Sequence, residues 1–257
     1  MIKVAVCGSL GKMGKEVVET VQNAPDMELV GLIDKFYTTN EIDGVPAGQN
    51  LEEMLQKIDA DVVVDFTQPA SVFENTKTAI LNGVRPVIGT TGLSDEQIAE
   101  LKDLSNKNNT ACLIAPNFAL GAVLMMKFSQ MASKYFANAE IIEYHHNQKK
   151  DAPSGTAIKT AQMMIKERDN FATGNCAETE TITGSRGGKF ENNIQIHSVR
   201  MPGYVASQEV IFGASGETLK IRHDSIDRKC FMSGVALAIR HIFAHNDFIY
   251  GLDNILN

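Results

Sequence analysis

The sequence predicts an α/β protein, with a doubly wound parallel sheet in its first half and a second, mixed α/β domain after it. In the first half, short apolar runs alternate with amphipathic stretches of helical period, which is the order of strands and helices in a parallel sheet. The apolar runs are continuous, as in strands that are buried on both faces. This regular alternation stops after Asn117, where a different order of elements begins.

Five apolar runs predict the strands of the first domain, at Ile2–Cys7, Glu28–Asp34, Asp61–Phe66, Arg85–Ile88 and Ala111–Ala115. Three amphipathic stretches between them predict helices, at Lys12–Gln22, Ala70–Leu81 and Ser94–Asn106. Ser94 and Gln97 have the spacing of a capping box at the start of the third helix. Crossovers between parallel strands are right-handed, so we expect helices on both faces of the sheet.

The second domain is predicted to mix helices with strands. Helical patterns lie at Leu120–Phe136 and Pro153–Arg168, and Pro153 suits the first helical position. Strand patterns lie at Ala139–His146, Asn193–Arg200, Gln208–Ala214 and Thr218–His223, with polar, glycine-rich sequence at Thr173–Lys189 and a closing apolar helix at Arg228–His245. We expect residues 1–116 and 224–257 to form the first domain and residues 117–223 the second.

The composition is typical of a globular protein. Of the 257 residues, 44% are hydrophobic and 21% charged, and the net charge of −7 with a pI near 5.4 argues against nucleic acid or an anionic membrane as the main partner. No apolar run reaches the roughly 18 residues of a membrane span. A strand at Ile2–Cys7 leaves no room for a cleaved leader, so we expect a cytoplasmic protein. The four cysteines lie far apart and three have apolar neighbours, so we expect buried free thiols.

A glycine-rich turn follows the first predicted strand. It reads Gly8-Ser9-Leu10-Gly11-Lys12-Met13-Gly14, with the spacing GxxGxxG in place of the usual GxGxxG. Such a turn brings a helix N-terminus up to a pyrophosphate. Asp34, 20 residues after Gly14, can bond the ribose hydroxyls of a dinucleotide. The alternative is a tight turn followed by a solvated strand end.

Lys35 bears on which dinucleotide is bound. A cation beside the ribose can hold the 2′-phosphate of NADP, whereas Asp34 alone favours NAD, so we expect both NADPH and NADH to be used. Two later loops, Gly89-Thr90-Thr91-Gly92 and Ala115-Pro116-Asn117-Phe118, follow the fourth and fifth strands. Ligands bind at the carboxyl ends of strands in such sheets, although both loops are equally compatible with ordinary turns.

The stretch Glu143-Tyr-His-His-Asn-Gln-Lys-Lys-Asp-Ala-Pro-Ser-Gly-Thr-Ala157 has the strongest chemical pattern. It places His145, His146 and Lys149 ahead of a predicted helix that opens with small residues. Free amides at a helix start attract an anion and a lysine neutralises it. Histidine is the side chain best suited to move a proton near neutral pH. The stretch therefore predicts a site for a small acid with a proton donor.

Simpler interpretations of these residues stay open. Adjacent strand residues point to opposite faces, so one histidine could pack beneath the sheet while the other is solvated. Lys149 and Lys150 could be a solvated pair, and zinc lacks a cysteine or histidine three or four residues away to complete its ligands. Three other charged residues have structural alternatives: a turn or helix cap for Asp151, and carboxylate clamps or ion pairs for Arg186 and Arg222.

These motifs together resemble the dihydrodipicolinate reductase family, also called hydroxy-tetrahydrodipicolinate reductase, of bacterial lysine biosynthesis. The resemblance covers essentially the full length and is carried by Val4–Gly14, Val64–Pro69, Gly89–Gly92, Ala115–Gly121, Glu143–Ala157, His197–Gly203 and Glu217–Ser225. The segment HHNQKKDAPSGT is its most specific part. Asp34-Lys35 departs from many members, which have a longer acid or an arginine there.

The resemblance implies reduction of the cyclic dicarboxylate 4-hydroxy-tetrahydrodipicolinate by NADPH or NADH, with loss of water, to tetrahydrodipicolinate in the diaminopimelate route, by a homotetramer. It implies that His145 is the proton donor and acceptor, that Lys149 is the second catalytic residue, and that His146, Gly155 and Thr156 contact the substrate. The implied cofactor contacts are Gly8, Ser9, Leu10, Gly11, Lys12, Met13, Asp34, Lys35, Gly89, Thr90, Thr91, Ala115, Pro116, Asn117 and Phe118.

Two other functions are compatible with the nucleotide motif. A dehydrogenase of another amino-acid intermediate would use the same glycine turn, but it does not explain the His-His-x-x-Lys stretch. A non-catalytic dinucleotide sensor would keep the turn and Asp34 but has no need of His145 and Lys149.

Overall fold

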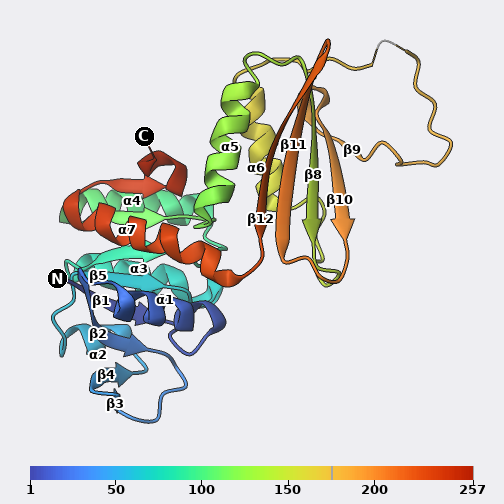
Figure 1. The fold of residues 1–257 in the computed structure, drawn as a ribbon. Coiled ribbons are helices and arrows are strands. Elements are labelled where there is room, and N and C mark those ends of the chain that lie inside the picture. The colour runs from blue at the N-terminus through green and yellow to red at the C-terminus, as the bar shows by residue number, and fades with distance from the viewer. Residues whose placement is uncertain (175, 257) are drawn as a thin grey trace. The chain divides into compact units, whose positions relative to one another are not determined.

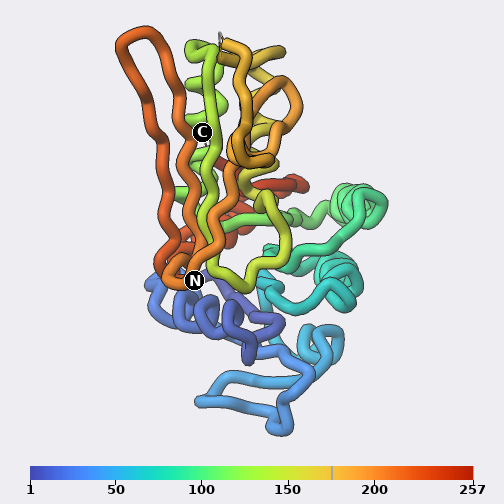
Figure 2. The backbone as a smooth tube through the Cα atoms, turned by 90° about the vertical axis from the view of Figure 1, so that its right-hand side faces the viewer, coloured from blue at the N-terminus to red at the C-terminus, as the bar shows by residue number. Residues whose placement is uncertain are grey.

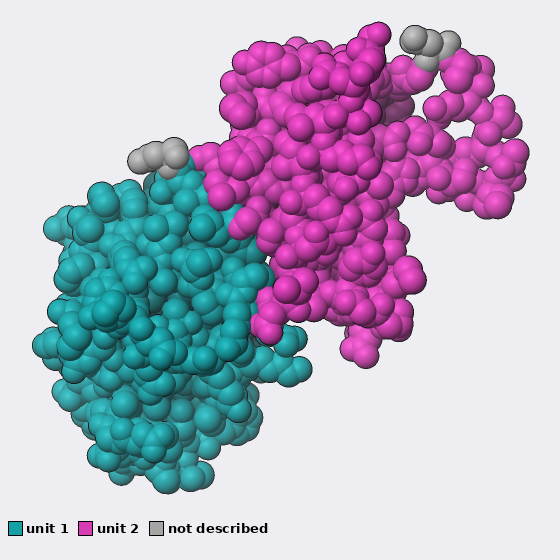
Figure 3. Space-filling view, viewed as in Figure 1, with its two compact units in different colours: residues 1–120, 228–257 teal, residues 121–227 magenta. Residues whose placement is uncertain are grey.

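The computed structural model describes residues 1–174 and 176–256 and divides the chain into two compact units. Unit 1 is Met1–Leu120 with Arg228–Asn257, and unit 2 is Gly121–Asp227 (Figure 3). The boundaries expected from the sequence, after residues 116 and 223, lie a few residues before those of the structure. Among the described residues, no helix has the length and apolarity that a bilayer crossing requires.

Unit 1 is built on a largely parallel sheet with the strand order β13-β7-β6-β5-β1-β2-β4-β3. Its strands are β1 (Ile2–Cys7), β2 (Met27–Ile33), β3 (Glu41–Ile42), β4 (Val45–Gly48), β5 (Val62–Asp65), β6 (Arg85–Ile88), β7 (Cys112–Ile114) and β13 (Phe248–Tyr250). The neighbouring pairs are parallel except β3 and β4, which form a hairpin. The doubly wound parallel sheet predicted from the sequence is confirmed.

Helices cover both faces of this sheet, with α1 and α7 on one face and α3 and α4 on the other (Figure 1). The helical segments of unit 1 are α1 (Lys12–Asn23), α2 (Leu51–Leu55), α3 (Pro69–Leu81), α4 (Asp95–Asn108), the 3₁₀ turn η2 (Arg228–Phe231), α7 (Met232–Ala244) and the 3₁₀ turn η3 (Leu252–Ile255). The capping box of α4 is confirmed: Gln97 N donates to Ser94 Oγ at 3.3 Å, and Ser94 N donates to Gln97 Oε1 at 2.9 Å.

Unit 2 has a five-stranded mixed sheet with the order β12-β11-β8-β10-β9. Its elements are α5 (Leu120–Ala132), β8 (Asn138–His145), α6 (Gly155–Ile165), β9 (Gly188–Lys189), the 3₁₀ turn η1 (Glu191–Asn193), β10 (Gln195–Arg200), β11 (Ala206–Ala214) and β12 (Glu217–Ser225). The central strand β8 is parallel to β10 and antiparallel to β11, and β11 with β12 makes a long hairpin (orange in Figure 2).

The two faces of the unit 2 sheet differ in character. Side chains of Ala132, Ala161 and Met164 from α5 and α6 pack with Ile141 and Phe212 of the sheet in a buried core. Along β8, alternate residues Ala139, Ile141 and Glu143 are buried while Glu140, Ile142 and Tyr144 are partly exposed. Glu143 therefore points to the same face as the core, although it is a carboxylate.

The start of α6 differs from the prediction. Pro153 does not occupy the first helical position: α6 begins at Gly155, and Ser154 is its N-cap. Ser154 has an extended backbone, with φ −66° and ψ 151°, and its hydroxyl accepts a hydrogen bond from Ala157 N at 3.2 Å. The helix ends at Ile165, with Lys166 as its C-cap, rather than at the predicted Arg168.

The cysteines are free, but fewer are buried than expected. Cys7 and Cys112 are buried on strands of unit 1, Cys230 is half-buried and Cys176 is exposed. Cys230 lies in η2, where the chain turns ahead of α7. Its apolar sequence neighbours thus did not guarantee full burial.

Candidate functional site

The turn after β1 brings backbone amides to the carboxyl end of the unit 1 sheet. Gly8 has a φ of +77°, and a Cβ built on it would lie 2.6 Å from the Phe66 carbonyl oxygen. A Cβ on Gly14 would overlap the carbonyl of Gly8. Gly11 is the N-cap of α1 and offers no side-chain hydrogen bond to the helix. The first amides of α1 can therefore receive an anion.

The residues between these glycines have different roles. Ser9 is buried, and its hydroxyl bonds the Tyr37 hydroxyl at 3.0 Å and the Ile33 carbonyl at 3.3 Å. These hydrogen bonds stabilise the turn, and they use the Ser9 side chain so that it does not face a ligand. Lys12 is exposed and Met13 half-buried at the start of α1.

A cavity of about 390 Å³ lies beside this turn. Gly8, Leu10, Gly11, Asp34, Lys35 and Phe36 contribute to its lining, together with the loop after β5. The Asp34 carboxylate accepts hydrogen bonds from Leu10 N at 3.2 Å and Phe36 N at 3.1 Å, which fix its direction. Lys35 is exposed, with its Nζ 5.0 Å from the centroid of the Phe36 ring. A carboxylate and a cation thus stand side by side at the end of β2.

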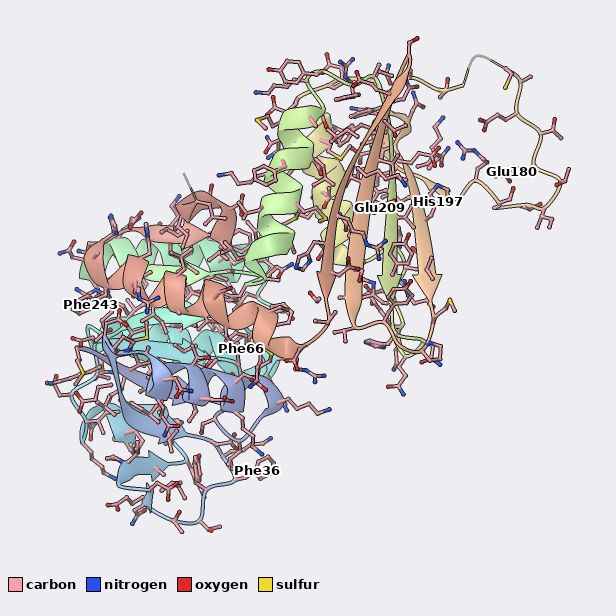
Figure 4. The ribbon with its side chains drawn as sticks, viewed as in Figure 1. Phe36, Phe66, Glu180, His197, Glu209 and Phe243 are labelled. Carbon is pink, nitrogen blue, oxygen red and sulfur yellow. The ribbon has the colours of Figure 1, made fainter. Side chains whose placement is uncertain are left out.

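Phe66, which follows β5, joins the three loops that the sequence singled out (labelled in Figure 4). Its carbonyl lies under Gly8, and its ring leaves no room for a Cβ on Gly89. Its ring centroid lies 5.8 Å from that of Phe118. The turn after β1 approaches the backbone of Phe66, and the loops after β6 and β7 contact its ring. The three loops therefore meet around one residue, which had no predicted role from the sequence.

Asp65 holds the same loops through hydrogen bonds. It is fully buried at the end of β5. Its Oδ1 accepts from Thr67 N at 2.9 Å, the Thr67 hydroxyl at 2.7 Å and the Thr90 hydroxyl at 2.8 Å, and its Oδ2 accepts from Asn75 Nδ2 at 2.8 Å. Four hydrogen bonds therefore satisfy the buried carboxyl group. The side chain of Thr90 is thereby used for structure, whereas Thr91 is exposed.

The loop after β7 is mostly packed. Ala115 and Phe118 are buried, Pro116 is exposed, and Asn117 is half-buried with its Oδ1 accepting from Ala119 N at 2.8 Å. Only Pro116 and Asn117 of this loop have side chains with substantial exposure.

In unit 2, the two adjacent histidines have different environments. β8 ends at His145, whose side chain is only 15% exposed and whose Nδ1 lies 2.5 Å from Glu143 Oε2. His146 is exposed and its Nδ1 accepts from Gln148 N at 3.3 Å. Alternation along the strand thus separates them, and His145 is the one that faces the protein interior.

Buried Glu143 forms an ion pair with half-buried Arg200 next to His145. Glu143 is fully buried, and Arg200 at the end of β10 donates to its two oxygens from Nη1 at 2.8 Å and Nη2 at 2.7 Å. Burial raises the pKa of Glu143, but hydrogen bonds from His145 and Arg200 outweigh it and lower the pKa to about 2. Glu143 is therefore ionised at neutral pH. Neither residue had a predicted role from the sequence.

Lys149 lies in the loop after β8 and is held by Asp151. Its Nζ is 2.7 Å and 2.8 Å from the two Asp151 oxygens, and its side chain is 20% exposed. The hydrogen bond from Lys149 lowers the pKa of Asp151. Arg200 Nη2 also donates to the Asp151 carbonyl at 2.8 Å. Asp151 is therefore an ion-pair partner in this turn, and the prediction that it could cap the helix is wrong because Ser154 does so.

The N-terminus of α6 completes the group. Ser154 N donates to Glu143 Oε1 at 3.2 Å. Gly155 is exposed, and a Cβ built on it would meet open space; Thr156 is half-buried. His145, Lys149 and the first residues of α6 are thus connected through Glu143, Arg200 and Asp151. A proton-carrying ring, an ammonium group and a helix N-terminus together can receive a carboxylate and supply a proton.

Arg186 and Arg222 form ion pairs elsewhere in unit 2. Arg186 pairs with Glu140 at 2.7 Å and Glu178 at 3.1 Å. Arg222 pairs with Asp224 at 2.8 Å, and its guanidinium carbon lies 4.9 Å from the Tyr144 ring centroid. Of their two interpretations, the structure favours the structural ion pair.

Comparison with known proteins covers both halves of the chain. The family model described as dihydrodipicolinate reductase, N-terminus, matches residues 2–118, and that described as dihydrodipicolinate reductase, C-terminus, matches residues 121–256.

Individual relatives match over the full length. The chain is 53% identical to a 4-hydroxy-tetrahydrodipicolinate reductase of Listeria monocytogenes over 264 residues, covering 100% of both chains. It is 50% identical to one of Streptococcus pneumoniae, with 99% of each chain covered. Among solved structures, dipicolinate-bound dihydrodipicolinate reductase from Paenisporosarcina sp. TG-14 is 47% identical, covers 100% of both chains and has a TM-score of 0.93. The chain therefore belongs to the dihydrodipicolinate reductase family.

Proposed function

We propose that this chain reduces 4-hydroxy-tetrahydrodipicolinate with His145 as the proton donor, and with Lys149 and the N-terminus of α6 as the receptor for a substrate carboxylate. The reductase activity follows from family membership, because full-length relatives at 50–53% identity are 4-hydroxy-tetrahydrodipicolinate reductases. The chain is an oxidoreductase of the diaminopimelate route to lysine, and the reaction releases water. The family's N-terminal half implies a nicotinamide cofactor. The residue roles are our proposal.

The observation that carries this assignment is the grouping of His145 and Lys149 with the start of α6. The side chains of His145 and Lys149 are mostly buried but still reach solvent, with exposed fractions of 15% and 20%. A sensor that only bound a dinucleotide would need neither group in this arrangement. We assign His146, Gly155 and Thr156 as further substrate contacts; the open space above Gly155 supports close approach of a ligand to its backbone.

The substrate is proposed to be a cyclic dicarboxylate. A relative that is 47% identical was solved with dipicolinate bound, which is a planar ring with two carboxylates. Lys149 is already paired with a carboxylate, that of Asp151, at 2.7 Å and 2.8 Å. The ammonium group of Lys149 has three donors, and the contact with Asp151 shows that it is placed to bind a carboxylate.

The cofactor contacts are assigned to unit 1. The open amides at Lys12 and Met13 in the first turn of α1 suit the pyrophosphate, and Gly11, whose amide donates to the Gly8 carbonyl at 2.9 Å, lets the backbone approach it closely. Asp34 and Lys35 suit the adenosine ribose. The loops at Gly89–Thr91 and Ala115–Phe118 are held around Phe66 at the same sheet edge. When bound, the nicotinamide supplies a hydride. We propose that both NADPH and NADH serve, because Asp34 favours a free 2′-hydroxyl and Lys35 favours a 2′-phosphate.

We also propose a homotetramer. Apolar side chains of unit 2 are exposed beside and on its sheet, including Met201 at 53%, Val205 at 39% and Leu219 at 37%. Contacts between copies would remove these surfaces from water. Light scattering during size-exclusion chromatography should give about four times the mass of one chain, and a monomer would contradict the proposal.

The function is tested by following oxidation of NADPH spectrophotometrically with the condensation product of pyruvate and aspartate semialdehyde. His145→Ala should lower kcat by about 10²–10⁴, as expected for loss of a proton donor. His146→Ala serves as the matched neighbour and should mainly raise KM. The reverse behaviour of the two variants would show that the wrong histidine has been assigned.

A further inference from the structure

Glu143 is a buried carboxylate whose hydrogen-bond partners are Ser198 of β10 and three residues around the proposed site, His145, Ser154 and Arg200. Its Oε2 contacts His145 Nδ1 at 2.5 Å and accepts from Arg200 Nη1 at 2.8 Å. Its Oε1 accepts from Arg200 Nη2 at 2.7 Å and from Ser154 N at 3.2 Å. Ser154 is the N-cap of α6, so one carboxylate contacts the proton donor and the residue that begins the anion-binding helix.

A buried glutamate–arginine pair alone would not require a histidine. Burying two charges costs free energy that their attraction offsets only with good geometry, and apolar residues could fill the same space. The bidentate contact with Arg200 already balances the charge of Glu143. The contact with His145 is an additional one. It uses Nδ1 of the ring, so Nε2 is the nitrogen that stays available for a substrate.

A second glutamate on the same strand provides an internal comparison. Glu140 contacts His197 Nε2 at 2.8 Å and Arg186 Nη2 at 2.7 Å, so it repeats the combination of glutamate, histidine and arginine. Its side chain is 36% exposed, and it lies on the opposite face of β8, away from α6. The same chemistry therefore occurs twice on one strand, once beside the proposed site and once apart from it (His197 is labelled in Figure 4).

We propose that Glu143 is a positioning residue for proton transfer: it fixes the His145 ring with Nδ1–H toward its own carboxylate, so that Nε2 delivers the proton to the substrate. This inference rests on the proposed role of His145. Arg200 keeps Glu143 in place, and through the Asp151 carbonyl it also ties the loop of Lys149 to the same point.

The proton balance follows from this arrangement. The imidazolium has protons on both nitrogens. Loss of water from the 4-hydroxy substrate leaves a double bond to be reduced. The Nε2–H bond of His145 then breaks, its electron pair stays on Nε2, and the proton goes to one end of that double bond. The bound nicotinamide would supply the hydride to the other end, so the substrate would be reduced and the nicotinamide oxidised. The neutral ring that remains keeps its Nδ1–H bond to Glu143. Solvent then returns a proton to Nε2.

The test is Glu143→Gln in the full-length chain, with Glu140→Gln as its matched control. An amide can donate as well as accept, so it no longer selects Nδ1–H. We expect kcat to fall at least 10²-fold in Glu143→Gln, while the inhibition constant of dipicolinate changes less than threefold; in serine proteases the analogous acid-to-amide change lowers kcat about 10⁴-fold through the wrong tautomer. Glu140→Gln should stay within twofold of the unaltered chain in kcat.

Two further measurements separate positioning from a structural role. In a double-mutant cycle, Glu143→Gln should cost little further activity once His145 is alanine, whereas a structural defect would add to that loss. NMR with ¹⁵N-labelled histidine, at a pH where the ring is neutral, should show the His145 proton on Nδ1 in the unaltered chain and a shift toward Nε2 in Glu143→Gln. Additive losses, or an unchanged tautomer, would overturn the proposal.

The outcomes also distinguish this proposal from the proposed function. If His145→Ala has near-normal kcat, the proton-donor assignment fails. If His145→Ala loses activity but Glu143→Gln does not, only the positioning role fails. Should Glu143→Gln not fold, Glu143→Asp keeps a charge for Arg200 but withdraws the carboxylate from His145; it should lower kcat by more than tenfold, and a normal kcat would overturn the proposal.

Discussion

We expect Asp34 and Lys35 to act in opposite directions on the 2′ position of the cofactor ribose. Asp34 is held by Leu10 N and Phe36 N, so its charge cannot swing away from a phosphate. Lys35 is exposed, and its attraction for a phosphate is weakened by salt. We predict kcat/KM values for NADH and NADPH within about tenfold of each other, or roughly 1.4 kcal/mol.

Lys35→Ala should weaken NADPH more than NADH, and any NADPH preference should shrink as ionic strength rises. Steady-state kinetics with both cofactors at several salt concentrations measure this. Lys57→Ala, an exposed lysine on the same unit, is the control and should change neither cofactor. Equal losses for the two cofactors in Lys35→Ala would leave Lys35 as a surface charge.

Lys149 is the residue that we expect to pair with a substrate carboxylate. Lys149→Ala should lower kcat/KM by at least two orders of magnitude, roughly 3 kcal/mol of transition-state stabilisation, with cofactor affinity unchanged. Steady-state kinetics measure kcat/KM, and calorimetric titration with NADPH measures the cofactor affinity separately. Lys150→Ala removes an exposed charge next to Lys149 and should leave both kcat/KM and cofactor affinity nearly unchanged. Near-normal kinetics for Lys149→Ala would contradict the substrate-site assignment.

Among the helices and strands, the features that the sequence predicted are those that depend on residues close together in the chain. The capping box of α4 is one: both of its hydrogen bonds form between residues three apart. Ser94→Ala should lower the free energy of unfolding by about 1 kcal/mol. Urea denaturation checks this, with Lys102→Ala as the control because lysine and alanine have similar helix propensities at an exposed site. An unchanged unfolding midpoint would mean that the helix start is stabilised by packing alone.

Elements without a long periodic pattern were missed. The hairpin of β3 and β4 has strands too short for periodicity, although its Asp43-Gly44 turn, with φ values of +50° and +81°, is a strong hairpin signal. β13 has three residues and is recognisable only as the partner of β7. The start of α6 was misjudged because Pro153 and Ser154 both fit a helix start, and only the backbone of Ser154 decides between them.

The candidate site was predictable where its residues are consecutive. His145, Lys149 and Gly155 lie in one stretch of sequence, and so does the glycine turn with Asp34 one strand later. Glu143 was within that stretch but gained meaning only from Arg200, which is 57 residues away and opposite His145 in the pairing of β8 with β10. Tertiary partners of this kind have no signal in local periodicity.

At the scale of the whole molecule, a chain of net charge −7 has to bind an anionic cofactor and a dicarboxylate. Long-range attraction cannot achieve this, because the overall field is repulsive. We expect local groups to do so instead, namely the open amides of α1 and α6 and the side chains of Lys35 and Lys149. Much of the remaining positive charge is already paired internally, as Arg200, Arg222 and Arg240 show.

Because of these internal ion pairs, the free energy of unfolding of the whole chain depends on pH in the acid range. Contacts with His145 and Arg200 outweigh burial and lower the pKa of Glu143 from its usual 4.5 to about 2, and the hydrogen bond from Arg222 lowers the pKa of Asp224 from 3.8 to about 2. A carboxylate whose pKa is depressed by folding stabilises the native state above its unfolded pKa. That stabilisation is lost as the pH falls through the folded pKa.

We therefore predict that the melting temperature falls steeply between about pH 4.5 and pH 2, the window set by these two carboxylates. Glu143→Gln should be less stable near neutral pH, by on the order of 3 kcal/mol for the charge alone, and its difference from the unaltered chain should shrink as the pH falls through this window. Thermal melts followed by circular dichroism in steps from pH 7 to pH 2.5 measure the two curves. Glu41→Gln, at an exposed carboxylate of β3, should follow the unaltered chain throughout. A stability difference for Glu143→Gln that stayed constant across the window would mean that the variant acts through packing, and that ionisation of Glu143 does not govern the acid limb.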